Sequence, residues 1–175
     1  MQTQVEILPT IETSRLRLRC PVIEDAADYQ VLEADPAVKQ FLRGPSKLTV
    51  EDYKSAIGSS RDRLGLTVTL KDTSAFVGRC GVTQNPFVEG WEIDIVIART
   101  YQKKGYGVEI GSALIPRGFK ALGCSIIFGV PDAANTASIH LCEKLGMKFV
   151  RSLTRNHRLQ HVYAIEGAPN IKIGC

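Results

Sequence analysis

Two glycines and two lysines stand together in the segment Gln102-Lys-Lys-Gly-Tyr-Gly107, which follows an apolar run and opens a helical pattern. Gly105 and Gly107 let the backbone approach a ligand closely, and the free N–H groups of a first helical turn bind anions. Lys103 and Lys104 add positive charge at the same end. The segment predicts a site for a di- or triphosphate-bearing ligand; the alternative is a glycine-rich turn with two solvated lysines.

Two other phosphate-binding motifs are excluded by their spelling. A dinucleotide-binding fingerprint requires G-x-G-x-x-G, whereas Gly111 follows Gly107 one residue too late. The G-x-x-x-x-G-K-[ST] string of a P-loop does not occur in the chain.

A pair of acids precedes the glycine-rich segment. Glu92 and Asp94 lie two residues apart in an apolar run, so they share one face of a strand. A carboxylate beside a partly desolvated cleft has a raised pKa and acts as a base. The alternative is a pair of acids that hold the structure together or bind substrate charge.

Hydrophobic periodicity predicts the elements that position these residues. Antiparallel strands come first, and strand–helix–strand–helix follows, which indicates an α/β (α+β) mixed sheet of about six to seven strands with helices on both faces. The strand–helix–strand unit 91–130 is expected to be parallel and right-handed. Strands are predicted over 13–20, 66–70, 75–83, 91–98, 125–130, 147–153 and 158–166, and helices over 24–34, 35–42, 49–57, 105–122 and 135–145.

Length and composition fit one domain spanning residues 1–175, with 44% hydrophobic and 23% charged residues. No apolar stretch approaches the ~20 residues of a membrane span, and the first residues do not resemble a secretory signal. The five cysteines are scattered and the three histidines complete no ligand set, so no metal site is predicted. We therefore expect a cytosolic (cytoplasmic) protein with reduced thiols, no membrane partner and an oligomeric state that the sequence leaves open.

The net charge of +4 is concentrated near the C-terminus. Residues 147–175 hold five Lys or Arg against one acid, Glu166. This basic third either meets an anionic ligand or forms a solvated strand surface. It has neither the dense clustering nor the interleaved aromatics of a nucleic-acid binder, so the pattern does not favour that function.

Gln102-x-x-Gly105-x-Gly107 resembles the acetyl-coenzyme A pyrophosphate motif, Q/R-x-x-G-x-G/A, of the GNAT superfamily of N-acetyltransferases. Upstream, Glu92-Ile-Asp-Ile-Val-Ile is similar to the superfamily's fourth strand. Downstream, Glu109 and Phe119-x-x-Leu-Gly123 stand where that family's helix carries an acid and an aromatic-x-x-Leu-Gly ending. The resemblance covers roughly residues 12–166.

Further motifs resemble one branch of the superfamily. Asn135-Thr-Ala-Ser138 followed by Glu143-Lys-Leu-Gly-Met147 is similar to that branch's N-x-x-S…E-K-L-G-F string. Thr13 to Arg19 matches its T-x-R-L-x-L-R opening. The branch includes enzymes that acetylate the N-termini of ribosomal proteins.

The resemblance implies a fold and a coenzyme site. The two central parallel strands splay apart, and the pantetheine arm of acetyl-CoA pairs with unpaired backbone groups between them, because its two amides need partners when desolvated. Asn135 contacts the same arm, or is only a helix N-cap, or both. The implied coenzyme-binding residues are Val96, Ile97, Ala98, Gln102, Lys103, Lys104, Gly105, Tyr106, Gly107 and Asn135.

The resemblance also implies catalytic roles. Glu92 occupies the position of the family's strand-four glutamate, so it is favoured over Asp94 as the general base. Many members place a tyrosine acid seven residues after the motif asparagine, where this chain has Cys142, which we expect to be packed in the core. Ser138 matches the branch's serine and is the candidate proton donor to the departing sulfur.

These residues predict an N-acetyltransferase that moves the acetyl group of acetyl-CoA to a primary amine, either a protein N-terminus or a small molecule. Holding thioester and amine in one ternary complex makes a covalent acetyl-enzyme unnecessary. The alternative is a non-catalytic acyl-CoA-binding module or sensor, which the missing tyrosine keeps open.

Overall fold

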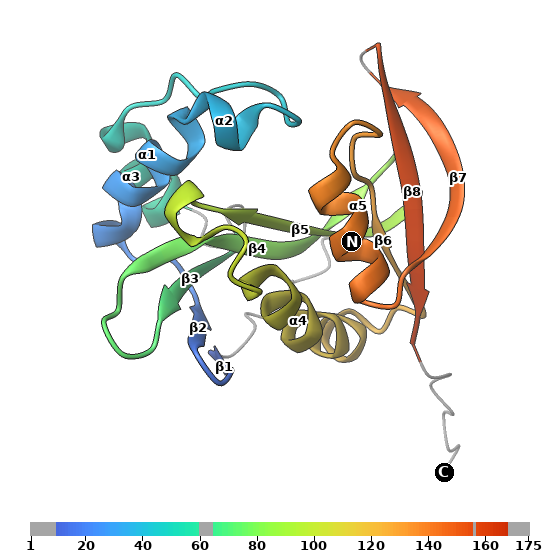
Figure 1. Cartoon of the computed structure of the whole chain (residues 1–175). Coiled ribbons are helices and arrows are strands. Elements are labelled where there is room, and N and C mark those ends of the chain that lie inside the picture. The colour runs from blue at the N-terminus through green and yellow to red at the C-terminus, as the bar shows by residue number, and fades with distance from the viewer. Residues whose placement is uncertain (1–9, 60–64, 156, 168–175) are drawn as a thin grey trace.

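An eight-stranded mixed sheet organises the chain (Figure 1). The computed structural model describes residues 10–59, 65–155 and 157–167. The strand order is β1-β2-β3-β4-β5-β6-β8-β7, and every neighbouring pair is antiparallel except β5 and β6. The strands are β1 (Ile11–Glu12), β2 (Leu16–Arg19), β3 (Leu66–Leu70), β4 (Phe76–Asn85), β5 (Gly90–Ile97), β6 (Ile126–Gly129), β7 (Lys148–Arg155) and β8 (Arg158–Glu166).

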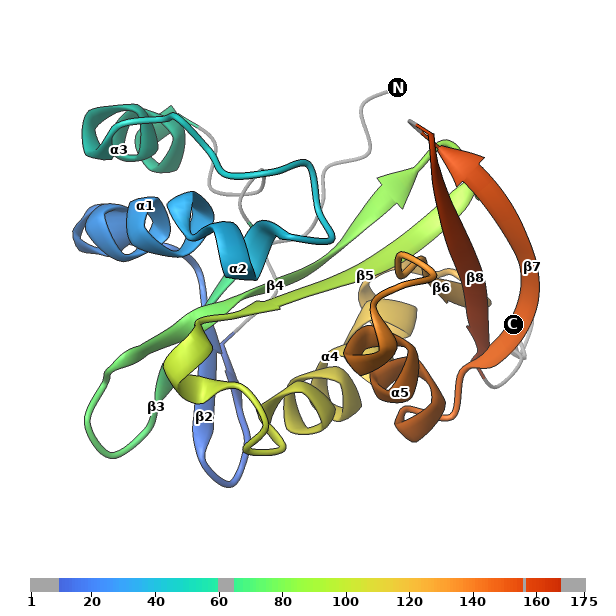
Figure 2. The same ribbon diagram turned by 45° about the horizontal axis from the view of Figure 1, so that its top comes forward.

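Helices cover both faces of the sheet, as Figure 2 shows: α1, α2 and α3 lie on one face, and α4 and α5 lie on the other. The α-helices are α1 (Ala26–Ala34), α2 (Pro36–Lys39), α3 (Val50–Ser59), α4 (Tyr106–Leu122) and α5 (Thr136–Lys144). Short 3-10 turns precede α1 at Ile23–Asp25 and follow β5 at Arg99–Tyr101.

The predicted mixed α/β fold is confirmed, with two local differences. The sheet gains β1, a two-residue strand that forms only because Ile11 pairs with Leu18 across a tight turn. The helix expected over 35–42 ends at Lys39, after which Leu42 donates an i→i−3 hydrogen bond to the Lys39 carbonyl and the chain leaves helical geometry.

Local signals in the sequence explain where the elements begin. Thr49 and Asp52 form the predicted capping box at the start of α3: Thr49 Oγ1 accepts from the Asp52 amide, and Asp52 accepts from the Thr49 amide. Asp35 caps α2 by accepting from the Ala37 amide, with Pro36 at the first helical position.

The main core lies between the sheet and α4. The alternating residues of β2, Leu16 and Leu18, are fully buried and pack with Ile110 and Leu114 of α4. Apolar residues two positions apart share one face of a strand, and apolar residues four positions apart share one face of a helix. These two apolar faces pack against each other. This packing fixes the first turn of α4 against the end of β5.

The two parallel strands separate soon after they meet. β5 pairs with β6 only at Trp91 with Ile127 and Glu92 with Phe128, although β5 continues to Ile97. β6 ends at Gly129, and the chain then turns toward α5. The predicted splay is therefore present, and it begins directly after Glu92.

Candidate active site

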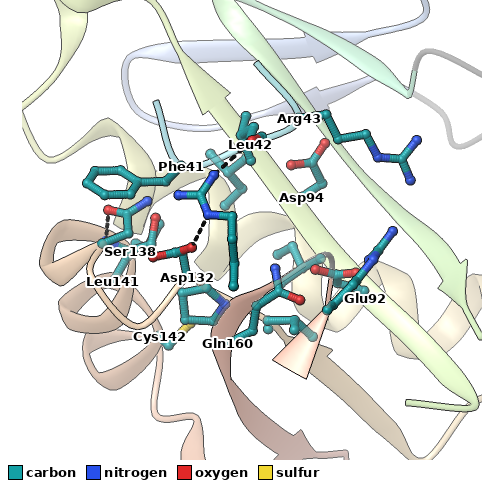
Figure 3. A pocket seen from close by; sticks show the side chains of 18 of the residues that line it. Phe41, Leu42, Arg43, Glu92, Asp94, Asp132, Ser138, Leu141, Cys142 and Gln160 are labelled. Carbon is teal, nitrogen blue, oxygen red and sulfur yellow. Dashed lines mark hydrogen bonds and ion pairs between the residues drawn. The ribbon is translucent and has the colours of Figure 1, made fainter. Parts of the chain in front are cut away.

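A cavity of about 940 Å³ lies where β5 and β6 separate (Figure 3). Its lining includes both candidate catalytic residues, Glu92 and Ser138, together with Asn135. These come from elements far apart in the sequence: Glu92 from β5, and the other two from the start of α5. The fold thus brings the predicted base and the predicted acid to one cavity.

Glu92 has the electrostatics of a base near neutral pH. Burial raises the pKa of Glu92 to about 7, against the opposing effect of a hydrogen bond from Asn85; the charge of Asp94 raises the pKa and that of Arg155 lowers it. The hydrogen bond runs from Asn85 Nδ2 to Glu92 Oε2. The carboxyl can therefore change its protonation state near neutral pH and accept a proton when ionised.

Asp94 takes the structural role that the sequence left open. It is ion-paired with Arg79, whose Nε also lies 2.6 Å from Glu33 Oε1. Burial alone would lower the pKa of Arg79, but Asp94 and Glu33 raise it, so the guanidinium stays charged. Glu33 in turn binds the buried Lys39. This chain of charges joins α1, α2, β4 and β5. Among the described residues that line the cavity, Glu92 is the carboxylate without an ion pair, because Asp94 pairs with Arg79 and Asp132 with Arg158.

The start of α5 presents Ser138 to the cavity. Asn135 is the N-cap of α5, because its Oδ1 accepts from the Ser138 amide at 3.2 Å. The hydroxyl of Ser138 makes no hydrogen bond among the described residues. Cys142, one turn further on, is buried, and burial raises the pKa of its thiol to about 11, so it stays protonated and packs in the core as expected.

The glycine-rich turn has the geometry of an anion site. Gly105 lies in the left-handed region at φ +82° and ends the turn that starts α4, and Lys103 is also left-handed at φ +60°. Within the described chain, the amides from Lys103 to Gly107 donate no backbone hydrogen bond, and the lysines are exposed. Amides of this kind at the start of a helix can bind an anionic group.

Gln102 anchors this turn to β5. Its Nε2 donates to the Ile97 carbonyl at 2.9 Å. The Ala98 amide, directly after β5, donates to the carbonyl of Val77 in β4. Because backbone groups alternate sides along a strand, Val96 and Ala98 face β4, whereas Ile95 and Ile97 face the splay. The backbone groups that face the coenzyme side are thus those of Ile95 and Ile97.

Two further contacts join segments that lie far apart in the sequence and that no motif links. Glu109 accepts hydrogen bonds from Thr13, Ser14 and Arg15, which lie before β2. Arg158 forms an ion pair with Asp132 at 2.7 Å. Glu109 and Thr13–Arg19 both belong to motifs that the sequence shows, but nothing in either segment indicates that the two are in contact.

Within the described ranges, no group of three or more His, Cys, Asp or Glu side chains is arranged to hold a metal ion. None of the described helices is both long and apolar enough to cross a bilayer. Four of the five cysteines are free thiols, and Cys175 lies outside the described residues.

Comparison with known proteins agrees with this geometry. Residues 15–148 match the family model of the acetyltransferase (GNAT) domain. The uncharacterized protein YkkB of Bacillus subtilis (strain 168) is 29% identical over 162 residues, covering 86% of this chain and 92% of YkkB. Among solved structures, a GNAT-family acetyltransferase from Bacillus anthracis has a TM-score of 0.78 at 23% identity, covering 90% of this chain and 98% of that one.

A spermidine N-acetyltransferase from Vibrio cholerae, solved in complex with CoA and spermine, has a TM-score of 0.74 at 16% identity, covering 88% of this chain and 96% of that one. These likenesses cover 86–90% of this chain. With a family model that matches most of its length, the chain belongs to the GNAT family of acetyltransferases, whose co-substrate is acetyl-CoA.

Proposed function

We propose that this protein transfers the acetyl group of acetyl-CoA to a primary amine bound in the 940 Å³ cavity. The observation that carries the proposal is the joint position of Glu92, with its pKa near 7, and Ser138 on that cavity, where the parallel strands part.

The coenzyme is proposed to lie along the splay. The free amides from Lys103 to Gly107 hold the pyrophosphate, with Lys103 and Lys104 adding positive charge. The backbone groups of Ile95 and the Ile97 amide pair with the pantetheine amides, and Asn135 borders the arm at the start of α5. This arrangement directs the thioester toward Glu92.

The chemistry is a direct displacement. The amine nitrogen attacks the thioester carbonyl carbon, the carbon–sulfur bond breaks, and the amine gives a proton to Glu92. Ser138 donates a proton to the departing sulfur and regains one from solvent, while Glu92 releases its proton to solvent. Deprotonating a lysine-like amine of pKa ~10.4 costs about 4.6 kcal/mol at pH 7, while an α-amine near 8 costs about 1.4 kcal/mol. A carboxylate of pKa near 7 is a suitable base for either amine. An α-amine depends less on the base, because its deprotonation costs less free energy.

The test is thiol release by the full chain mixed with acetyl-CoA and single amines: an alanine-starting peptide, free amino acids, spermidine and an aminoglycoside. Acceptor-dependent thiol release, with an acetylated product identified by mass, supports the proposal. The ribosomal-protein branch resemblance is the reason for including the peptide. Tight acetyl-CoA binding with no acceptor-dependent thiol would instead assign the protein as a coenzyme-binding module.

A further inference from the structure

The acceptor side of the cavity is lined by more basic than acidic side chains. Three of the cations have carboxylate partners: Arg79 pairs with Asp94, and Arg158 pairs with Asp132. Lys39 pairs with Glu33 behind the cavity wall. The charged residues that line the cavity are Lys39, Arg43, Arg79, Arg155 and Arg158 against Glu92, Asp94 and Asp132.

Arg43 and Arg155 remain without such a partner. Among the described residues, no carboxylate oxygen lies within 4.0 Å of either guanidinium. Arg155 stacks over the Phe87 ring at 4.3 Å, and its charge lowers the pKa of Glu92, which places it near that carboxylate. Arg43 extends over the side of the cavity that holds Asp94 and Glu92 (Figure 3).

The segment that carries Arg43 is held in place by a clamp. Arg158 Nη1 donates to the Leu42 carbonyl at 3.1 Å, and Nη2 donates to the Gln40 carbonyl at 3.3 Å. The same guanidinium is fixed by the buried Asp132. Since both neighbours of the intervening residue Phe41 are bound, the backbone leading to Arg43 is fixed at the rim of the cavity.

A hydrogen-bond acceptor in the same cavity has no donor. Gln160 Oε1 is excluded from solvent and accepts no hydrogen bond from any described residue. Gln160 lines the cavity, and Figure 3 shows its amide on the same side as Glu92. A buried acceptor without a donor is costly, and a rotation of the Gln160 side chain that opens this oxygen to the cavity would let a ligand N–H group satisfy it.

We propose that the acceptor is a small amine that also carries an anionic group, a carboxylate or a phosphate. The ammonium or amine group lies beside Glu92, where a rotated Gln160 side chain accepts from it, and the anionic group binds Arg43 and Arg155. This inference rests on the proposed acetyl transfer and names the acceptor class. A polyamine would meet two unneutralised guanidinium groups at this place, which disfavours it.

The coenzyme pyrophosphate does not account for Arg155. Glu92, whose pKa is lowered by the charge of Arg155, and Ala98, beside the glycine-rich turn, are six residues apart on an extended strand, which spans about 20 Å. The pyrophosphate proposed at the turn is therefore far from Arg155, which is available for the second substrate. Arg43 lines the same cavity.

Matched acceptors test the proposal. β-Alanine and β-alaninamide differ by the only carboxylate of the pair, and O-phosphoethanolamine and ethanolamine differ by the only phosphate; spermidine serves as the polycation. Thiol release gives kcat/KM for each, and calorimetric titration of the CoA-loaded protein gives binding without turnover. We expect at least one anionic member to be favoured over its neutral partner by about tenfold or more, as for a charge-assisted pair to arginine. The pair that shows the preference distinguishes carboxylate from phosphate.

The variants Arg43→Ala and Arg155→Ala should reduce that preference ratio to near one. Arg151→Ala is the matched control, because Arg151 is an exposed arginine of the same strand, outside the cavity, and it should keep the ratio. Equal or better binding and turnover of neutral amines or spermidine would overturn the anionic-acceptor proposal alone. If no amine of any charge releases thiol, the proposed transfer fails, while the titrations still decide whether the cavity prefers anions.

Discussion

Arg15 and Glu109 are 94 positions apart in the chain, yet they share two hydrogen bonds. The Arg15 amide donates to Glu109 Oε1 at 2.9 Å, and its Nε donates to Oε2 at 2.7 Å. Arg15 Nη1 also reaches the Lys104 carbonyl at 3.1 Å. One carboxylate in the first turn of α4 thus joins the chain before β2 to the phosphate-binding turn.

Glu109→Gln should destabilise the fold by roughly 1–2 kcal/mol, because it weakens a set of charge-assisted hydrogen bonds at a partly buried site. Urea unfolding of both proteins at pH 7 measures the difference. Glu51→Gln is the control: Glu51 forms only an exposed i,i+3 pair with Lys54, and its loss should leave stability almost unchanged.

The effect of Glu109 should depend on pH. Burial alone would raise the pKa of Glu109, but hydrogen bonds from Thr13, the Arg15 amide and side chain, and Ser14 lower it to about 2. The unfolded value is near 4.3. The stabilisation is therefore complete above about pH 5 and is lost as pH falls toward 2. A difference between wild type and Glu109→Gln that stays constant from pH 7 to pH 3 would contradict this account.

Local chemistry made much of the fold predictable. The capping residues Thr49 and Asp52, the alternation of Leu16 and Leu18, and the glycine turn before α4 each act through neighbours within a few positions. Such signals are present in the sequence itself. For the same reason the glycine-rich turn at the start of α4 was predictable as a turn.

Contacts between distant segments were not predictable from one sequence. Glu92 and Asp94 lie two residues apart on the same face of β5, so the sequence does not distinguish their roles. The structure does, because Asp94 is ion-paired with Arg79. Which backbone groups of β5 face the splay depends on the register of β5 with β4. In this register the Ala98 amide points to β4, away from the splay where the coenzyme is proposed to lie. The Arg158 clamp on Leu42 spans 116 positions. Each depends on tertiary geometry.

Glu92→Gln should lower kcat by about 10²–10⁴, the usual contribution of a general base. In wild type, kcat/KM should rise with pH through an apparent pKa near 7, because the ionised carboxylate is the base. The variant should lose that rise. Glu89→Gln, an exposed glutamate three residues upstream, serves as the control and should keep the wild-type profile. An unchanged profile in Glu92→Gln would assign the titration to another group.

Asn85→Asp should move that midpoint to higher pH by about one pH unit. Asn85 Nδ2 donates to Glu92, a bond that lowers the glutamate's pKa, and the substitution replaces this donor with a second negative charge. The aspartate keeps an oxygen for the Phe87 amide, which Asn85 Oδ1 binds at 2.8 Å, so the turn is preserved. A midpoint that stays or falls would show that Asn85 does not tune the base.

Ser138→Ala should reduce kcat about tenfold or more while changing the acetyl-CoA KM less, because the hydroxyl acts on the departing sulfur rather than in binding. Its amide still donates to Asn135, so the cap of α5 is retained. Ser112→Ala, at an exposed position of α4, is the control and should behave as wild type. Steady-state kinetics with both substrates varied separate the two constants; an unchanged kcat would remove Ser138 from the mechanism.

Gly105→Ala and Gly123→Ala form a matched pair that isolates the phosphate-binding turn. Both glycines have positive φ, +82° and +61°, at the two ends of α4, so an alanine at either position costs roughly 1–2 kcal/mol of backbone strain. Only Gly105 orients the free amides between Lys103 and Gly107. Gly105→Ala should therefore weaken CoA binding about fivefold or more, the equivalent of one lost amide hydrogen bond, while Gly123→Ala leaves it near wild type.

Calorimetric titration with CoA measures the dissociation constants, and thermal unfolding confirms that both variants carry a similar loss of stability. If both bind CoA as tightly as wild type, the phosphates do not rely on the backbone of this turn. Equal weakening in both variants would instead trace the effect to general destabilisation of α4. A loss confined to Gly105→Ala identifies the left-handed residue at the start of α4 as the one that sets the amides toward the diphosphate.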